Sequence, residues 1–307
     1  MKTLPDRLSH HEQTLLGNLK NPDKAFWDAL CMETEKSLSD ALSSADGAVA
    51  DRAWFLNRVA QCYRGFVTCF EQMRTGAFYE AWCEFERIEI ALPWLVANPF
   101  LNPKDFAIGA LKKRVTQWQS LYPYKVFISP GMIHRRKECS LCHAVISPWN
   151  SCAHEVGKVY DGRECYRIVT KAEFLEVSLV LDPVQKYSVA FAAKGPDGKA
   201  VDHHDHSVAR FLVDRLASPF DDWLVQRTFA YHPHSLFPNA TEEGPCPCES
   251  GRSYKGCCLS RRGVVRPHFQ FAFKKPPAQS LPSAAFAGYG ERNGPADIRE
   301  SDALMAK

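Results

Sequence analysis

The stretch GPCPCESGRSYKGCCL, from Gly244 to Leu259, brings four cysteines close together in an otherwise ordinary sequence. The spacing is Cys246-x-Cys248, eight intervening residues, and then Cys257-Cys258. Two short pairs of thiolates joined by a tight turn can occupy the corners of a tetrahedron around zinc, with Zn–S distances of about 2.3 Å. A segment this short cannot bury a core of its own, so we expect metal binding and local folding to occur together.

Four protein ligands leave no coordination position for water or substrate, and the predicted site is therefore structural and not catalytic. Ser250-Gly251 allows the chain to reverse between the two cysteine pairs, while Arg252 and Lys255 offset part of the thiolate charge. Zinc is the expected metal, with iron as the alternative at thiolate ligands. A redox role for these thiols, or chance clustering, is the competing interpretation.

The segment CPCESGRSYKGCC resembles the SEC-C motif, a short zinc-binding module found at the C-terminus of the preprotein translocase motor SecA and in smaller bacterial proteins. The chain has no G-x-x-x-x-G-K-[ST] loop, so it does not resemble the nucleotide-driven part of that motor. The resemblance implies a zinc finger that presents a basic surface to partners such as the SecB chaperone or the ribosome. Unlike the family pattern, a long tail follows the motif. The matching residues are Cys246, Cys248, Ser250, Gly251, Tyr254, Lys255, Cys257 and Cys258.

A second cluster combines Cys139-x-x-Cys142 with Cys152-x-His154. Cys-x-x-Cys on a tight turn is a common half-site for zinc, and the cysteine–histidine pair can supply the other half. We therefore expect a second structural zinc. His143 and Cys165 are close enough in sequence to replace one of these ligands, and thiols without metal are the alternative.

The region from Cys139 to Pro183 resembles zinc-knuckle-bearing relatives of phage prohead maturation proteases, in which a hairpin precedes a Glu-x-Ser-x-Val strand. The resemblance implies a phage-related accessory protein with Ser178 as a nucleophile. On an alternating strand, however, a serine is ordinarily an outward-facing polar residue. Hydrolysis also needs a base near the serine, and His154 is already assigned to metal. The residues that match the strand are Glu176, Ser178 and Val180.

The run VDHHDHS, which contains Asp202, His203, His204, Asp205 and His206, offers further metal-capable side chains. Adjacent histidines usually point apart, and polar residues are common where a loop enters a helix, so Asp205 or Ser207 can cap a helix at Val208. The alternative is a hydrolytic metal site with open coordination positions. That site would pair His203 or His206 with His232 or His234.

The bulk composition gives no sign of a charged partner or a membrane. The 307-residue chain carries 38 basic and 35 acidic groups and has 45% hydrophobic residues, enough for a packed core. We expect neither a spanning helix nor a secretory signal, and therefore a reducing, cytoplasmic location for its 12 cysteines. Cys31, Cys62, Cys69 and Cys83 lie in helical patterns and are predicted to be small buried apolar residues.

Residues up to about 124 carry the period of amphipathic helices. Asn21-Pro22-Asp23 and Asn102-Pro103 predict two helix starts. Thr75-Gly76 separates two helices that can pair antiparallel. The apolar positions of the first helix are Phe55, Val59, Cys62, Tyr63, Phe66 and Phe70, and those of the second are Phe78, Ala81, Trp82, Phe85, Ile88 and Leu92.

The middle of the chain changes to β-prone sequence. YKVFIS, FLEVSLVL and QKYSVAFAA predict strands, and Asp161-Gly162 predicts a hairpin turn. Residues 208–217 and 221–231 are predicted helices. Basic residues and alternating Phe269, Phe271 and Phe273 follow the last cysteine, in a tail that could touch RNA or an acidic protein.

These patterns predict an α+β protein. Its parts are a helical domain over 1–124, an α+β zinc-binding domain with trailing helices over 125–240, the SEC-C zinc module over 241–262, and a flexible proline-containing tail over 263–307. The predicted function is a metal-stabilised adaptor in the bacterial cytoplasm that contacts a protein or ribonucleoprotein partner. The alternative is a serine- or metal-dependent hydrolase, so enzymatic activity stays open.

Overall fold

The computed structural model describes residues 3–44, 46–275 and 287–288, and within them the fold is mixed helix and sheet. The chain divides into two compact units. The first contains Met1–Ser120 and Tyr124–Asp202, and the second contains Leu121–Pro123 and His203–Lys307. Helices dominate the start of the first unit, and the sheets are small and antiparallel, in agreement with the predicted α+β class.

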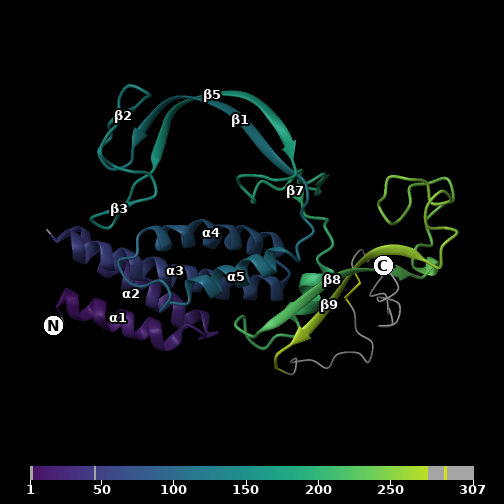
Figure 1. The fold of residues 1–307 in the computed structure, drawn as a ribbon, viewed down its shortest axis with the longest axis horizontal. Helices are drawn as coiled ribbons and strands as arrows, with labels where there is room; N and C mark the ends of the chain where they lie inside the picture. The colour runs from purple at the N-terminus through teal and green to yellow at the C-terminus, as the bar shows by residue number, and fades with distance from the viewer. Residues whose placement is uncertain (1–2, 45, 276–286, 289–307) are drawn as a thin grey trace. The chain divides into compact units, whose positions relative to one another are not determined.

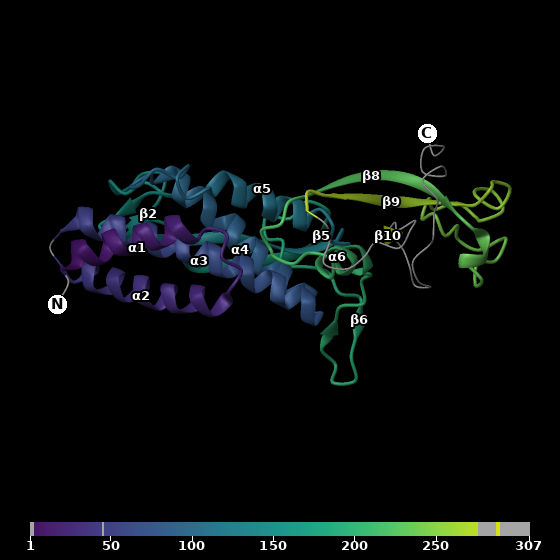
Figure 2. The ribbon, with the colours of Figure 1, turned by 90° about the horizontal axis from the view of Figure 1, so that it is seen from below.

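The first unit begins with a helical bundle, shown in two views in Figures 1 and 2. The predicted break between paired helices is confirmed at Gly76, which takes a left-handed φ of 90° and donates its N–H to Gln72 and Met73. Glycine adopts this φ at little cost because it has no Cβ, and the left-handed backbone at Gly76 ends the helix. The helices are α1 (Leu4–Asn18), α2 (Lys24–Leu42), α3 (Gly47–Thr75), α4 (Phe78–Ala97) and α5 (Ile108–Gln119).

The two predicted helix starts have different outcomes. Asp23 caps α2, since its carboxylate accepts a hydrogen bond from the backbone N–H of Ala25 at 2.9 Å. The start at Pro103 is wrong, because residues 103–107 form turns and α5 begins at Ile108. Ala107, with φ of 50°, breaks the run of helical backbone angles just before that helix.

Large aromatic side chains fill the core of the bundle. The indole of Trp27 stacks on Tyr63 with ring centroids 5.2 Å apart, and Phe85 stacks on Trp118 at 6.5 Å. The predicted buried cysteines are confirmed at three positions. Cys31, Cys62 and Cys69 are at most 3% exposed, while Cys83 is half-buried. Burial raises the pKa of Cys31 to about 11 and that of Cys62 to about 12, so these thiols stay protonated near neutral pH.

A long two-stranded ribbon follows the bundle in the first unit. Strand β1 (Phe127–Cys139) pairs antiparallel with β5 (Arg167–Val180), and β2 (Val145–Ile146) extends the other side of β1. The predicted strands YKVFIS and FLEVSLVL contribute to β1 and β5. QKYSVAFAA forms little strand, with β6 (Ala193–Lys194) starting near its end and pairing with β7 (Ala200–Val201).

The predicted hairpin at Asp161-Gly162 is confirmed. It joins β3 (Val159–Tyr160) to β4 (Arg163–Glu164), and Asp161 and Gly162 have φ of 50° and 73°, as a two-residue hairpin turn requires. The backbone N–H of Gly162 donates to the Asp51 carboxylate on α3 at 2.7 Å. Glu164 accepts a hydrogen bond from the Trp54 indole at 3.0 Å. The hairpin is therefore attached to the bundle.

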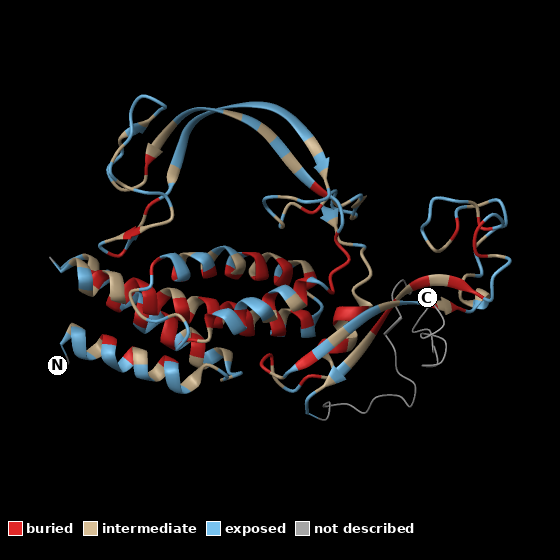
Figure 3. Ribbon diagram, viewed as in Figure 1, coloured by how far each residue is buried: buried red, intermediate tan, exposed pale blue. Residues whose placement is uncertain are grey.

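The opposite end of the ribbon is attached to α4. Glu86, only 3% exposed, accepts hydrogen bonds from the backbone N–H groups of Lys186 and Tyr187 at 2.5 and 2.6 Å. The indole of Trp82 donates to the Lys186 carbonyl at 2.6 Å. Between these two attachments the ribbon crosses above α4 in Figure 1, and most of its residues are exposed in Figure 3.

The second unit is built on β8 (Trp223–His232) and β9 (Val264–Phe273), which pair antiparallel from Trp223↔Phe273 to His232↔Val264. Its other elements are α6 (Ser207–Val213), the short helix η1 (His234–Leu236) and β10 (Ala287–Gly288). The predicted helix over 208–217 corresponds to α6.

Two expectations for the second unit are wrong. Residues 221–231 belong mostly to a strand and not to a helix, and 264–273 form its partner and not a flexible tail. Alternating aromatic residues suit a strand that pairs with another, and the partner lies across the cysteine-rich segment. Residues 276–286 and 289–307 of the expected tail lie outside the described residues. Within the described part of the chain, no helix is both long and apolar enough to span a membrane.

Candidate metal centres

The four cysteines of the second unit converge on one point. The donor atoms of Cys246, Cys248, Cys257 and Cys258 all lie within 4.8 Å of one another. The sulfur of Cys257 is 3.5 Å from that of Cys248 and 3.8 Å from that of Cys258. Four sulfurs at the corners of a zinc tetrahedron would be about 3.8 Å apart, as follows from the Zn–S distance. The donor set therefore fits the expected ion.

Backbone hydrogen bonds of the loop hold the two cysteine pairs against each other. The N–H of Cys246 donates to the Arg252 carbonyl at 2.8 Å, and the N–H of Cys257 donates to Tyr254 at 3.1 Å. Gly251 has φ of 75°, which confirms the predicted reversal of the chain at this glycine. The turn thus positions all four sulfurs from one brief segment.

The cysteine-rich loop is anchored to the sheet of its own unit. Tyr254, 4% exposed, contacts Nδ1 of His234 through its hydroxyl, and Nε2 of the same ring lies 2.9 Å from the Arg261 carbonyl. Arg266 on β9 donates to the Pro247 carbonyl at 2.5 Å and to Glu249 at 2.9 Å. These contacts hold the loop from both sides.

The surroundings of Cys248 favour a thiolate. Burial acts to raise its pKa, but hydrogen bonds from the Ser250 hydroxyl and from the thiols of Cys246 and Cys257 outweigh it and lower the pKa to about 6. Metal binding requires deprotonated sulfur, and a preformed thiolate reduces the cost of losing that proton. For Cys258, in contrast, burial raises the pKa to about 12, so this thiol would lose its proton to solvent only when its sulfur binds the ion.

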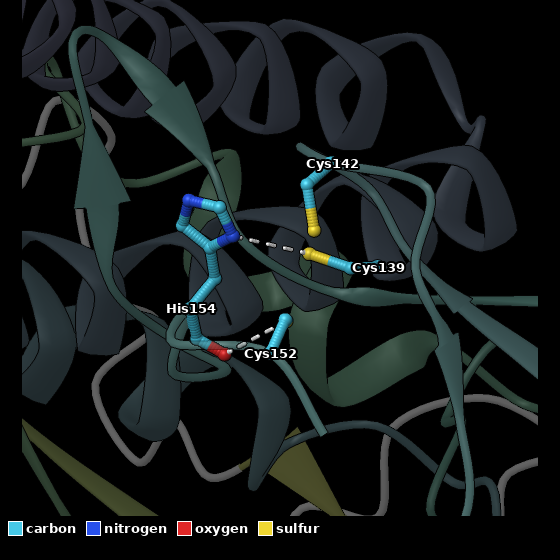
Figure 4. Close-up of side chains that lie close together, drawn as sticks. All are labelled: Cys139, Cys142, Cys152 and His154. Carbon is cyan, nitrogen blue, oxygen red and sulfur yellow. Dashed lines mark hydrogen bonds between the residues drawn. The ribbon is translucent and has the colours of Figure 1, made fainter. Parts of the chain in front are cut away.

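The middle cluster also brings its expected donors together. The sulfurs of Cys139, Cys142 and Cys152 and a ring nitrogen of His154 lie within 4.8 Å of one another. Figure 4 shows the His154 ring and the sulfurs of Cys139 and Cys142 facing one another, with Nδ1 of His154 3.8 Å from the Cys139 sulfur. Three thiolates and one imidazole form a common structural zinc set.

The turn from Cys139 to Ala144, at the end of β1, positions the first two sulfurs of this site. The N–H of Cys139 donates to the Ala144 carbonyl and that of His143 donates to the Cys139 carbonyl, each at 3.0 Å. His143 has φ of 57°, a conformation typical of the last residue of such a turn. Burial acts to raise the pKa of Cys139, but hydrogen bonds from the backbone of Cys142 and Leu141 outweigh it and lower the pKa to about 6.

His143 and Cys165, the alternative ligands for the middle centre, differ in their distance from the four donors. His143 is exposed and is not part of the four-donor group. Cys165 is fully buried, with its sulfur 4.0 Å from that of Cys139, and Arg167 lies 3.6 Å from the same Cys165 sulfur. Cys165 is thus a fourth thiol, beside the group of three thiols and one imidazole.

The residues of the hydrolase alternative do not meet in one group. Ser178 lies on β5, and its hydroxyl donates to Glu176 at 3.1 Å. Asp202 accepts a hydrogen bond from the Tyr124 hydroxyl at 2.5 Å. Asp205 accepts one from the N–H of Ser207, at the start of α6. Among the described residues, the two cysteine clusters are the groups of three or more possible ligands that come this close.

Sequence reasoning missed the residues that support the centres. His234, weighed as a ligand, instead contacts Tyr254, and Arg266, expected in a tail, holds the cysteine-rich loop. At the middle centre, the Asn98 side chain donates to the Gly157 carbonyl at 2.8 Å and accepts from the N–H of Val159 at 2.9 Å. A supporting role for Tyr254 could have been predicted, because this residue is part of the SEC-C-like motif. Asn98 and Arg266 act across long sequence separations that spacing does not report.

Comparison of the chain with protein-family models, with curated proteins and with solved structures finds no match.

Proposed function

We propose that this protein is an adaptor, stabilised by two structural zinc ions, that binds a protein or ribonucleoprotein partner through its SEC-C-like module at residues 241–262. The observation that carries the proposal is the pair of four-donor groups, each with its donor atoms within 4.8 Å. Four protein donors complete a tetrahedral shell and exclude a reacting molecule from the ion. Such a centre stabilises the fold of the binding surface and catalyses no reaction.

Zinc is the proposed ion at both centres. Each donor set consists of thiolates, with one imidazole in the middle centre, and these are ligands that zinc binds as a tetrahedron. The sulfur separations of 3.5 and 3.8 Å at Cys257 agree with that geometry.

The surface of the module suits an acidic partner. Arg252, Arg261 and Arg262 are exposed around the cysteine-rich loop, and the Arg262 guanidinium lies over the ring of Tyr231, 4.3 Å from its centroid. Lys255 is also exposed, although Glu242 and Glu243 lie within 3.6 Å of it. Guanidinium groups bind carboxylates and phosphates in a two-pronged manner, so the arginines favour an acidic protein or the phosphate backbone of RNA.

One experiment tests both parts of the proposal on the full chain. Metal analysis should find two zinc ions per chain, and Cys257→Ser should release one of them. Cys83→Ser, a half-buried cysteine outside both centres, is the matched control and should keep both. In parallel, co-sedimentation with purified bacterial ribosomes at low salt should be lost in Cys257→Ser and in an Arg261→Glu/Arg262→Glu variant.

The arginine variant needs its own control. Lys112→Glu/Lys113→Glu reverses two charges on α5, in the other unit, and should leave co-sedimentation unchanged. The arginine variant should keep both zinc ions, which separates loss of the surface from loss of the fold. Two retained ions in Cys257→Ser would contradict the metal centre. Equal ribosome binding by all variants would contradict the docking role.

A further inference from the structure

The ribbon of β1 and β5 has one apolar face and one mixed face. From Phe127 to Gly131 adjacent pairs in the ladder alternate between the two faces, and register shifts follow after Gly131, His134 and Arg136. The mixed face contains Ser129 opposite Ser178 and Gly131 opposite Glu176. The apolar face contains Ile128 opposite Leu179, Pro130 opposite Val177 and Met132 opposite Phe174.

The apolar face is the more exposed of the two. Along β1, residues 128, 130, 132 and 134 are exposed, whereas 127, 129, 131 and 133 are buried or half-buried. Met132 is 49% exposed, Phe174 59% and Leu179 71%, and Figure 3 shows the ribbon largely in the colour of exposed residues. A contiguous apolar face of this kind marks an interaction surface.

The outer edge of β5 is open. The sheet has the order β2-β1-β5, so among the described residues β5 pairs with β1 alone. Strand edges carry unpaired N–H and C=O groups and bind other strands readily. Charged side chains restrict such pairing, and near its centre β5 carries Lys171 and Glu173, both exposed and of opposite sign.

We propose that this edge binds the same edge of a second copy of the chain. The two β5 strands run antiparallel about a twofold axis through Ala172, and the two ribbons become one continuous sheet. In this register Lys171 lies opposite Glu173 of the second copy, and Glu173 lies opposite its Lys171. Two complementary ion pairs therefore form from one pattern of charge.

The charge pattern selects this partner and this register. An axis through Phe174 would place Lys171 opposite Val177 and Glu173 opposite Leu175, so neither charge would face an opposite charge of the second copy. With the axis through Ala172, the paired stretch from Lys171 to Glu173 lies between the register shifts of β5 at Thr170 and Leu175, where the strand is regular. A strand of unrelated sequence would not supply alternating charges at these two positions.

The proposal is tested by charge reversal and mixing, with sedimentation velocity of the full chain over a range of concentrations. The wild-type chain should show a monomer–dimer equilibrium. Lys171→Glu places like charges opposite each other twice and should weaken dimerisation by about tenfold or more. Glu173→Lys should act alike. Since Glu173 pairs with Arg135 of its own chain at 2.6 Å, that variant also carries Arg135→Glu to keep an ion pair there.

The decisive sample is the mixture of the two variants. Mixed chains restore opposite charges at both positions, so the mixture should dimerise about as strongly as the wild type, although each variant alone dimerises weakly. Lys20→Glu, an exposed reversal between α1 and α2, should dimerise like the wild type. A monomeric wild type, an undiminished dimer in Lys171→Glu, or a mixture that stays monomeric would each overturn the proposal.

Discussion

At the scale of single residues, the second unit contains two buried histidines, His232 and His268. His232, at the end of β8, is 2% exposed and shares a face of the sheet with Ala230 and with Arg266 and His268 of β9. Burial, together with the nearby His268 and Arg266, lowers its pKa to about 4. The histidine is therefore neutral in the folded chain at neutral pH.

This burial predicts an acid-sensitive unit. The pKa of an unfolded histidine is about 6.5, so His232 contributes its full stabilisation above pH 6.5 and loses it as the pH falls towards 4. Between pH 6.5 and pH 4, the free energy of unfolding should fall by about 3 kcal/mol less in His232→Gln than in the wild type. Denaturant titration at several pH values measures this difference. The exposed His10→Gln is the control, and identical pH profiles for wild type and His232→Gln would contradict the prediction.

The hairpin of β3 and β4 connects turn chemistry to tertiary contact at the scale of elements. Gly162 has φ of 73°, and a Cβ there would lie 2.9 Å from the Ala50 carbonyl oxygen and 3.1 Å from Leu42. Glycine is therefore required at position 162 for two reasons. The turn geometry needs it, and this can be predicted from the Asp-Gly pair. The close approach to α2 and α3 also needs it, and this cannot be predicted from the sequence. The same turn donates a hydrogen bond to Asp51.

Two glycine variants separate these two causes. Gly157 also has a positive φ, of 88°, but a Cβ there would meet nothing within 4 Å. Gly157→Ala should destabilise the chain by about 1 kcal/mol, from backbone strain alone. Gly162→Ala should cost roughly 2–3 kcal/mol, since the crowded bundle must also move. Denaturant unfolding measures both changes in the free energy of unfolding. Equal changes in the two variants would show that the contact between Gly162 and the bundle does not contribute to stability.

At the scale of the whole molecule, the sequence predicted best what depends on neighbouring residues. The α3–α4 pair, the Asp161-Gly162 hairpin and both four-donor groups each rest on short spacings, and the structure has all of them. It predicted poorly what depends on distant partners. The sequence predicts a helix at β8 and a tail at β9, and both predictions fail because the pairing of these strands joins Trp223 to Phe273 across the cysteine-rich loop.

Separate cores predict separate responses to metal removal. The α1–α5 bundle is packed around aromatic residues such as Trp27 and Phe85, whereas Tyr254 and Val264 pack around the C-terminal cysteines. A strong chelator should therefore leave most of the helical circular dichroism intact. Hydrogen exchange of residues 244–260 should rise sharply, and residues 50–70 serve as the internal reference. Loss of both signals together would contradict this independence.

The middle centre also occupies the connection between the two strands of the ribbon. Cys139 closes β1 and pairs with Arg167, where β5 begins, so the segment 140–166 is the loop that joins them. A long flexible loop makes the first strand contact entropically costly and slow to form, and a bound ion shortens the effective loop. An ion held by Cys139, Cys142, Cys152 and His154 would thus replace a tight turn, since it would set when, and in which alignment, the two longest strands of the first unit come together.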